Sequence, residues 1–179
     1  FVTDSNDDDV VVIDLQRGQI SLVAGQFGTP GTGDGAGAGA AFYAPTGLAA
    51  DGRGDLYVAD NLGRTVRKIV IASGAVSTIA GKPASSGFGD GVGVMAYFAQ
   101  PFGATANDLG DLFVSDSTNN AVRHVDVATG AVTTVIGGPS IDGVRLGALP
   151  AQLTLPSAVA LTRTGGLLVV SENAVLIAH

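Results

Sequence analysis

The feature that most constrains this fold is a 56-residue repeat, the spacing that separates Asp4 from Asp60 and Asp60 from Asp116. Matched residue types return at this spacing along the whole chain. The series are Asp4, Asp60, Asp116 and Glu172; Gly18, Gly74 and Gly130; and Val2, Val58, Val114 and Val170. Such a period is typical of repeat architectures, in which each unit packs against its neighbours. We therefore expect Val58, Val114 and Val170 to be buried at equivalent places.

One repeat contains four short apolar segments separated by turn residues. In the copy that begins at Pro45 these segments are 46–50, 56–59, 66–71 and 76–80, and the first turn is Asp51-Gly52-Arg53-Gly54. The second segment alternates as a strand does, with Leu56 and Val58 on one face. Solenoid helices would need a longer stretch of 3.6-residue periodicity, and a β-helix would need a shorter repeat. The pattern predicts an all-β β-propeller with four-stranded antiparallel blades and almost no helix.

The repeat divides the chain into blades and connections. We expect a partial blade at 1–25, whole blades at 43–81 and 99–137, and a partial blade at 154–179. The connections are 26–42, 82–98 and 138–153. They carry Gly33-Asp34-Gly35, Gly89-Asp90-Gly91 and Asp142-Gly143, and each ends in a motif A-x-Φ-x-x-P at 40–45, 96–101 and 151–156. Pro156 follows Pro101 one position sooner than Pro101 follows Pro45, because the third connection is rearranged. Residues 35–41 are interpreted as a flexible low-complexity loop.

These motifs resemble the NHL repeat. The run 42–49, followed by Gly54-Asp55-Leu56-Tyr57-Val58-Ala59-Asp60, is similar to the family pattern of a Pro-x-Gly-Φ-Ala strand, a Gly turn and Φ-Tyr-Val-Ala-Asp. Arg67 and Arg123 match the arginine of the family's third strand, and Val11 replaces it in the first copy. The Gly-Asp-Gly connection recurs in bacterial NHL proteins and resembles the propeller of teneurins. The resemblance implies the fold but leaves the function open, since propellers host lyases, hydrolases and scaffolds alike.

Rings of this family usually close with six blades or more, whereas this chain supplies about three. An open arc exposes unpaired strand edges, which invite pairing with another chain. We expect a fragment of a larger NHL protein, with the remaining blades outside this sequence; the alternative is a second copy that completes the ring.

Charge and composition restrict the partners. The formal net charge is −7, which disfavours nucleic acid and anionic lipid. Hydrophobic residues make up 46% of the chain, but no apolar run is long enough for membrane insertion. There is no Cys and no recognisable signal peptide. A secreted or periplasmic location is favoured over a cytoplasmic one.

Most of the acids fall in one set of loops, those after the second and fourth strands of each blade. They are Asp4, Asp7, Asp8, Asp9, Asp34, Asp60, Asp90, Asp116, Asp142 and Glu172, from a total of 16 acids. The pattern predicts an acidic face that binds a protein or a small molecule, including a cationic one. The candidate binding residues are Asp34, Asp60, Asn61, Asp90, Asp116, Asn119 and Asn120.

Each candidate also has an architectural interpretation. The acid that recurs in every blade is expected to accept backbone N–H bonds from the turn that follows it, as an Asx-turn. Ca²⁺ could bind the Gly-Asp-Gly connections only if several carboxylates converged. We therefore expect no resident cofactor and no metal site, with Ca²⁺ as the alternative.

An enzyme is the less favoured function. His124 and His179 are the only histidines, neither has a partner at ligand spacing, and His124 corresponds to Lys68 of the preceding repeat. A strand-surface histidine is therefore expected at 124. No catalytic residue is assigned, because the first strands offer no group that transfers protons near neutral pH. The sequence favours a non-enzymatic propeller scaffold; the alternative is a lactonase-like or amidating-lyase-like enzyme whose catalytic residues lie in blades outside this chain.

Overall fold

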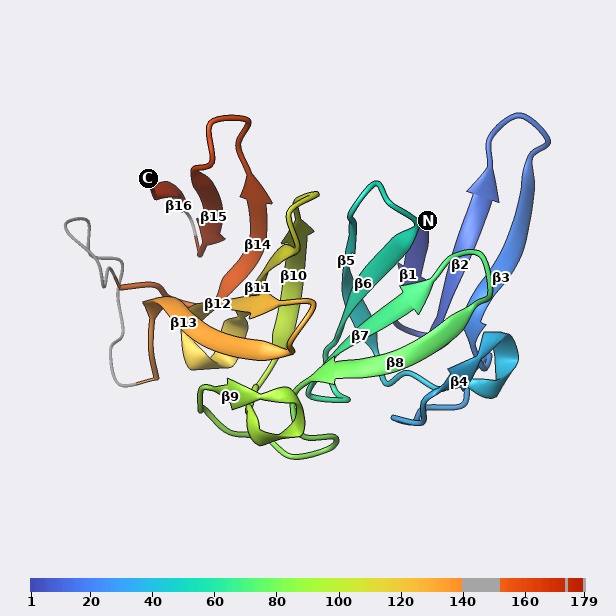
Figure 1. The fold of residues 1–179 in the computed structure, drawn as a ribbon, viewed down its shortest axis with the longest axis horizontal. Coiled ribbons are helices and arrows are strands. Elements are labelled where there is room, and N and C mark those ends of the chain that lie inside the picture. Colours follow the sequence, from blue (N-terminus) through green and yellow to red (C-terminus); the bar gives the residue numbers. More distant parts are fainter. Residues whose placement is uncertain (140–151, 173, 179) are drawn as a thin grey trace.

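The computed structural model describes residues 1–139, 152–172 and 174–178, and in these residues the fold is an arc of four antiparallel sheets (Figure 1). The predicted all-β propeller architecture is confirmed. The described helices are three 3₁₀ turns of three residues each: η1 (Gly37–Gly39), η2 (Gly93–Met95) and η3 (Ser117–Asn119). No helix in this part of the chain is long and apolar enough to cross a bilayer.

The two central sheets are blades of the expected form, with strand order following chain order. Blade 2 contains β5 (Pro45–Ala50), β6 (Asp55–Asp60), β7 (Thr65–Val70) and β8 (Ala75–Ala80). Blade 3 contains β10 (Pro101–Ala106), β11 (Asp111–Asp116), β12 (Ala121–Asp126) and β13 (Ala131–Gly137). The β5–β6 hairpin turns where predicted, because Asp51 Oδ1 accepts the N–H groups of Arg53 (2.7 Å) and Asp55 (3.2 Å).

Each central blade gains a fifth strand from the connection that precedes it. The two-residue strands β4 (Gly35–Ala36) and β9 (Gly91–Val92) pair with the outer strands β8 and β13. The interpretation of 35–41 as a flexible loop is therefore wrong, because β4 and η1 give this segment regular backbone structure. Each of these two connections thus crosses the outer edge of its own blade before the chain enters the innermost strand.

The end sheets have three strands each. Blade 1 contains β1 (Val2–Asp4), β2 (Asp9–Asp14) and β3 (Gln19–Gly25). Blade 4 contains β14 (Pro156–Leu161), β15 (Leu167–Ser171) and β16 (Ala174–Ala178).

The register of blade 4 differs by one residue from the predicted repeat. Pro156 pairs with Ser171, as Pro101 pairs with Asp116, so Ser171 and not Glu172 occupies the position of the repeated acid. Val169 is correspondingly buried, whereas Val170 is only partly buried and Glu172 is exposed. The expected burial of Val170 is therefore wrong, because the third connection is one residue shorter and a one-residue shift turns every side chain of a strand to its other face.

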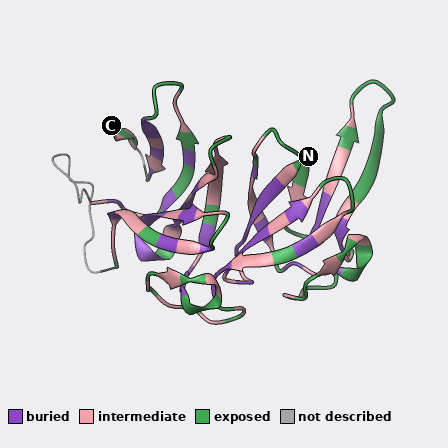
Figure 2. Ribbon diagram, in the orientation of Figure 1, coloured by how far each residue is buried: buried purple, intermediate pink, exposed green. Residues whose placement is uncertain are grey.

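The hydrophobic core lies between neighbouring sheets (Figure 2). On blade 2, Val58 and Ile69 face blade 1, while Ala59 and Val66 face blade 3. The innermost strands approach closely, since a Cβ on Gly47 of β5 would meet the backbone of β10. The fold is therefore a row of sheets packed face to face, and any groove between them is bounded by two blades.

Candidate functional site

A buried arginine collects two of the predicted site residues in blade 2. Arg67, on the third strand, has no exposed side-chain surface. Its Nη1 lies 3.2 Å from Asp60 Oδ2, and its Nη2 lies 2.9 Å from Asp34 Oδ1. The same two nitrogens donate to the carbonyl oxygens of Ala41 (2.9 Å) and Gly33 (3.0 Å). Asp34 and Asp60 therefore fix the connection to the blade that follows it.

The same unit recurs one repeat later around Arg123. Its Nη1 lies 3.4 Å from Asp116 Oδ2, and its Nη2 lies 2.8 Å from Asp90 Oδ1. The guanidinium lies over the ring of Phe98, as that of Arg67 lies over Phe42, with both distances 5.2 Å. These two rings are the Φ residues of the A-x-Φ-x-x-P motifs. In blade 4 the motif carries the buried Leu153.

The repeated acids do not act as predicted in the central blades. Asp4 forms the expected Asx-turn, accepting the N–H groups of Asn6 and Asp7. Asp60 instead accepts the N–H of Tyr43 (2.7 Å), and Asp116 those of Ala99 and Gln100, all directly before the first strand of the blade. The Asx-turn expectation is therefore wrong for Asp60 and Asp116. The physical reason is the arginine on the third strand, which the first copy replaces with Val11.

Burial raises the pKa of the Asp60 and Asp116 carboxyls. Desolvation raises the pKa of Asp60 to about 6, although the Tyr43 N–H and the Arg67 charge oppose it. Desolvation likewise raises the pKa of Asp116 against the hydrogen bonds from Asn119 and Gln100 and the charge of Arg123. An ionised carboxylate inside the sheet stack is costly even beside a cation. A ligand cannot reach either group from solvent, so neither belongs to an acidic binding face.

The predicted asparagines join neighbouring elements. Asn61 Nδ2 donates to the carbonyl of Pro101 in the next blade (3.0 Å). Asn119 Nδ2 donates to Asp116 Oδ2 (2.6 Å), and Asn120 Oδ1 accepts the N–H of Leu155 (2.8 Å). All three are buried, so their contacts hold the blades and their connections together. Asp142 lies outside the described residues.

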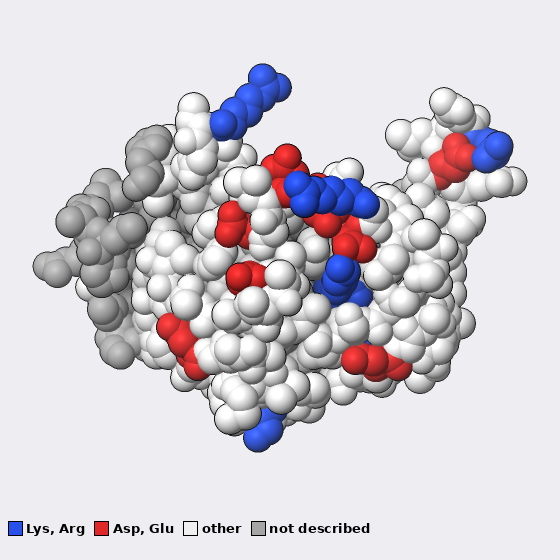
Figure 3. All heavy atoms as spheres, in the orientation of Figure 1, with Lys and Arg blue, Asp and Glu red and all other residues white. Residues whose placement is uncertain are grey.

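In the part of the chain that the structure describes, two grooves lie between neighbouring blades, and residues of the turns after first and third strands line them. We call the face that these turns of each blade define the short-turn face. Figure 3 shows acidic and basic side chains close together above the turns that join β5 to β6 and β10 to β11. The sequence analysis did not select the residues of these two turns as candidates for binding. The repeat nevertheless relates them, because Asn107 lies one full repeat after Asp51 and Asp111 lies one full repeat after Asp55.

A polar groove lies between blades 2 and 3 on the short-turn face. It encloses about 260 Å³, and its charged or hydrogen-bonding lining residues are Asp51, Arg53, Asp55, Tyr57, Lys68, Asn107 and Asp108. Lys68 Nζ forms an ion pair with Asp55 Oδ2 at 2.6 Å. Tyr57 Oη donates to Asp51 Oδ2 at 3.3 Å, and burial together with the charges of Asp51 and Asp55 raises the pKa of Tyr57 to about 12. The phenol is therefore a permanent donor in this groove.

Asp51, one of the aspartates that line this groove, stays ionised at neutral pH. Partial burial acts against ionisation of Asp51, but the N–H groups of Arg53 and Asp55 lower its pKa. Asp108 and Arg53 are exposed at the rim. The groove thus offers fixed charges of both signs to a solvated ligand.

The predicted strand-surface position of His124 is confirmed. It lies half-buried on β12, where its ring packs at 5.2 Å from Phe113. Its Nε2 lies 2.8 Å from Asp111 Oδ1, so this pair corresponds to Lys68 and Asp55 of the preceding repeat. Among the described residues, no three His, Asp or Glu side chains are grouped so that they could hold a metal ion.

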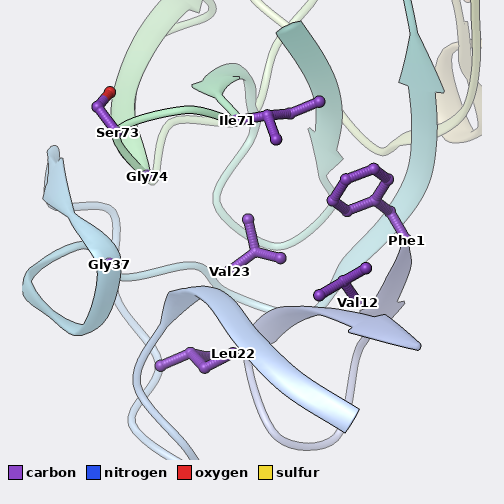
Figure 4. Close-up of a pocket in the computed structure, with 8 residues that line it drawn as sticks. All are labelled: Phe1, Val12, Leu22, Val23, Gly37, Ile71, Ser73 and Gly74. Carbon is purple, nitrogen blue, oxygen red and sulfur yellow. The ribbon is translucent and has the colours of Figure 1, made fainter. Parts of the chain in front are cut away.

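An apolar groove of about 480 Å³ lies on the other side of blade 2 (Figure 4). Its apolar side chains are Phe1, Val12, Leu22, Val23 and Ile71, and its rim includes Ser73. Phe1 and Val12 correspond to Tyr57 and Lys68 in the repeat. Equivalent positions in successive blades thus line grooves of different chemistry, one apolar and one charged, on the two sides of one blade.

Comparison with known proteins identifies these blades. The chain is 30% identical to NHL repeat-containing protein 2 of Bos taurus over 145 residues, which are 75% of this chain and 20% of that protein. The chain belongs to the NHL-repeat β-propellers. This NHL chain is also 30% identical over 139 residues to the Arabidopsis thaliana protein SUPPRESSOR OF QUENCHING 1, chloroplastic, covering 73% of this chain and 13% of that protein. It therefore spans a fifth or less of the length of these curated relatives. No protein-family model matches it.

Solved structures show the same fold at lower identity. An auxiliary nutrient binding protein from Bacteroides thetaiotaomicron aligns with a TM-score of 0.69 and 16% identity, over 92% of the NHL chain and 40% of that structure. Virginiamycin B lyase from Staphylococcus aureus aligns with a TM-score of 0.56 and 14% identity, over 92% and 42% of the two chains. These likenesses establish the propeller fold, which serves both binding and catalysis in the neighbours.

Proposed function

We propose that this propeller is a non-enzymatic scaffold, and that its short-turn face binds a protein or a small molecule carrying an apolar group and a cationic group. The observation that carries the proposal is the placement of two grooves of opposite character on the two sides of blade 2. Ligand sites in proteins combine apolar walls with a few fixed polar groups in this way. The sheet of blade 2 separates the two grooves and contributes residues to both.

The sign of the preferred charge follows from the pairing inside the polar groove. Lys68 is neutralised by Asp55 at 2.6 Å, which leaves Asp51 and Asp108 against the exposed Arg53. The whole chain has a formal net charge of −7. Both terms favour an approaching cation, and the apolar groove supplies a surface for an aromatic or aliphatic group beside it.

The test is a screen of the 179-residue chain against octapeptides that each carry two Lys and one aromatic residue. Binding should weaken about tenfold or more in Ile71→Asp and several-fold in Asp108→Asn, and it should weaken as salt rises, since exposed charges are screened within about 10 Å at 0.1 M. Glu172→Gln is the matched control, because it removes one exposed negative charge outside both grooves. Equal loss in the control, or no binding at any salt concentration, would overturn the proposal.

A lyase or hydrolase is the alternative function, with the catalytic groups shared with blades outside this chain. The His124–Asp111 pair at 2.8 Å is the observation that favours it, because a carboxylate orients an imidazole for proton transfer. Consumption of virginiamycin B that disappears in His124→Ala would support this alternative over the scaffold.

A further inference from the structure

One charged pair on the short-turn face contains a group that titrates near neutral pH. In blade 2 the pair is Lys68 with Asp55, whose atoms Nζ and Oδ2 lie 2.6 Å apart. One repeat later the same positions hold His124 and Asp111, with Nε2 of the imidazole 2.8 Å from Oδ1 of the carboxylate. Lysine keeps its charge throughout the neutral range, whereas histidine gains or loses its proton between about pH 5 and 8. The repeat therefore places a permanent ion pair in one blade and a pH-dependent pair in the next.

Few charged groups surround His124, so the effect of its proton can be located. On the neighbouring strand β11 the facing group is Asp111, and β13 on the other side carries no charged residue. On its own strand, Asp126 accepts the N–H groups of the turn that follows it. The described residues of blade 4, 152–172 and 174–178, include two charged side chains. Arg163 is exposed in the β14–β15 turn, and Glu172 follows the far end of β15. The proton on His124 therefore acts first on Asp111.

Asp111 connects this histidine to the polar groove between blades 2 and 3. Its Oδ2 accepts a hydrogen bond of 2.9 Å from Nδ2 of Asn107, which lines that groove beside Asp108. Oδ1 of Asn107 accepts the N–H groups of Leu109 and Asp111, so the amide is held in this orientation. The hydrogen bonds from Asn107 and His124 lower the pKa of Asp111 against partial burial. The carboxylate thus stays ionised over the pH range in which histidine titrates, two hydrogen bonds from the groove wall to the imidazole.

We propose that the charge of His124 regulates the affinity of the polar groove for cations; this inference rests on the proposed function of that groove. At low pH the imidazolium neutralises Asp111, as Lys68 neutralises Asp55. At higher pH the ring is neutral, and Asp111 adds an uncompensated negative charge behind Asn107. A neutral ring with its hydrogen on Nε2 still donates to Asp111, so the hydrogen bonds persist and the charge alone changes. A cation in the groove therefore binds more tightly as the pH rises through the histidine range.

The connection between His124 and the groove is tested first without a ligand. In the isotope-labelled 179-residue chain, nuclear magnetic resonance follows the ring protons of His124 and the side-chain amide of Asn107 as the pH is raised. Both signals should change with the same midpoint, and the change at Asn107 should disappear in His124→Gln. An Asn107 signal that ignores the titration of His124 would refute the regulation, whether or not a partner binds in the groove.

Binding is tested with an octapeptide that carries two Lys and one aromatic residue, at about pH 5.5 and about pH 8, on either side of the histidine range. The natural chain should bind it about threefold or more tightly at the higher pH. His124→Lys copies the preceding repeat and should bind weakly at both values, while His124→Gln should bind tightly at both. Because coupling is reciprocal, the peptide should also move the titration midpoint of His124 to lower pH.

The other groups that titrate in this range are kept in every variant. Asp60 has a pKa of about 6, and His179 is the second histidine of the chain. Neither can account for a difference between the two His124 variants. Tight binding with one and the same pH dependence in all three proteins would overturn the regulation but leave the proposed function standing. Absence of binding at either pH would remove both, since the groove would then take no cation.

Discussion

Asp60 Oδ2 lies 3.2 Å from Nη1 of Arg67, and both side chains are completely buried between the sheets. The pair is extended by Asp34, so one guanidinium holds a strand end and a connection together. Arg123 makes the same contacts with Asp90 and Asp116, so in each whole blade a buried arginine connects the preceding connection to the end of the second strand.

Arg67→Met should lower the free energy of unfolding by about 3–5 kcal/mol, because it leaves Asp60 buried without a counter-charge. Adding Asp60→Asn should restore part of this loss, since it removes the uncompensated charge. Urea denaturation of the two single variants and the double variant measures the coupling. Arg17→Met is the control: its pair with Asp14 is exposed, and its loss should leave the free energy of unfolding almost unchanged. A cost as small for Arg67→Met would contradict the assigned role.

The pH dependence of stability should carry the signature of Asp60. Its pKa is about 6 in the fold and 3.8 in an unperturbed chain, so the folded state binds this proton more tightly. The free energy of unfolding, relative to that of Asp60→Asn, should be highest below pH 3.8 and fall as the pH rises through about 6. The fall should reach up to about 3 kcal/mol, at about 1.36 kcal/mol for each unit of pKa difference. Stability that rises with pH over this range would show that the attraction of Arg67 outweighs desolvation.

Calcium should leave the melting temperature unchanged within about 1 °C at millimolar concentration, since no ligand stabilises a fold to which it does not bind. Asp34 and Asp90 are already bound to buried arginines at 2.9 and 2.8 Å, and each also accepts a threonine hydroxyl. A cation at either aspartate would have to compete with a fixed positive charge. Thermal melts with and without Ca²⁺ test this. A stabilisation of several degrees that vanishes in Asp34→Asn would establish a calcium site instead.

The fold was predictable because it follows from local patterns that repeat. The four strands of blade 2 and the turn at Asp51-Gly52-Arg53-Gly54 follow from alternation and turn chemistry alone. The register of blade 4 was not predicted correctly, although the shortened interval from Pro101 to Pro156 indicated the shift. When the positions are counted from the proline instead of from the repeated acid, Ser171 is the residue that pairs with Pro156.

The site was harder to predict, because hydrogen-bond partners distant in sequence decide it. Asp60 and Asp116 have the sequence pattern of turn acids, but their partners Tyr43 and Ala99 lie 17 residues upstream, before the first strand of each blade. The grooves depend on which blade faces which, and that becomes visible only when neighbouring sheets are packed. The repeat of Asp55 and Asp111, with Lys68 and His124 at matching offsets, was the available signal for the short-turn face.

We propose that partners bind on the short-turn face and not at the acidic connections. Amide chemical-shift mapping tests it directly, by titrating the isotope-labelled 179-residue chain with an octapeptide selected in the screen. The largest perturbations are expected at Arg53, Ile71 and Asp108, and they should diminish as salt is added. Perturbations confined to the connections around Asp34 and Asp90 would contradict it.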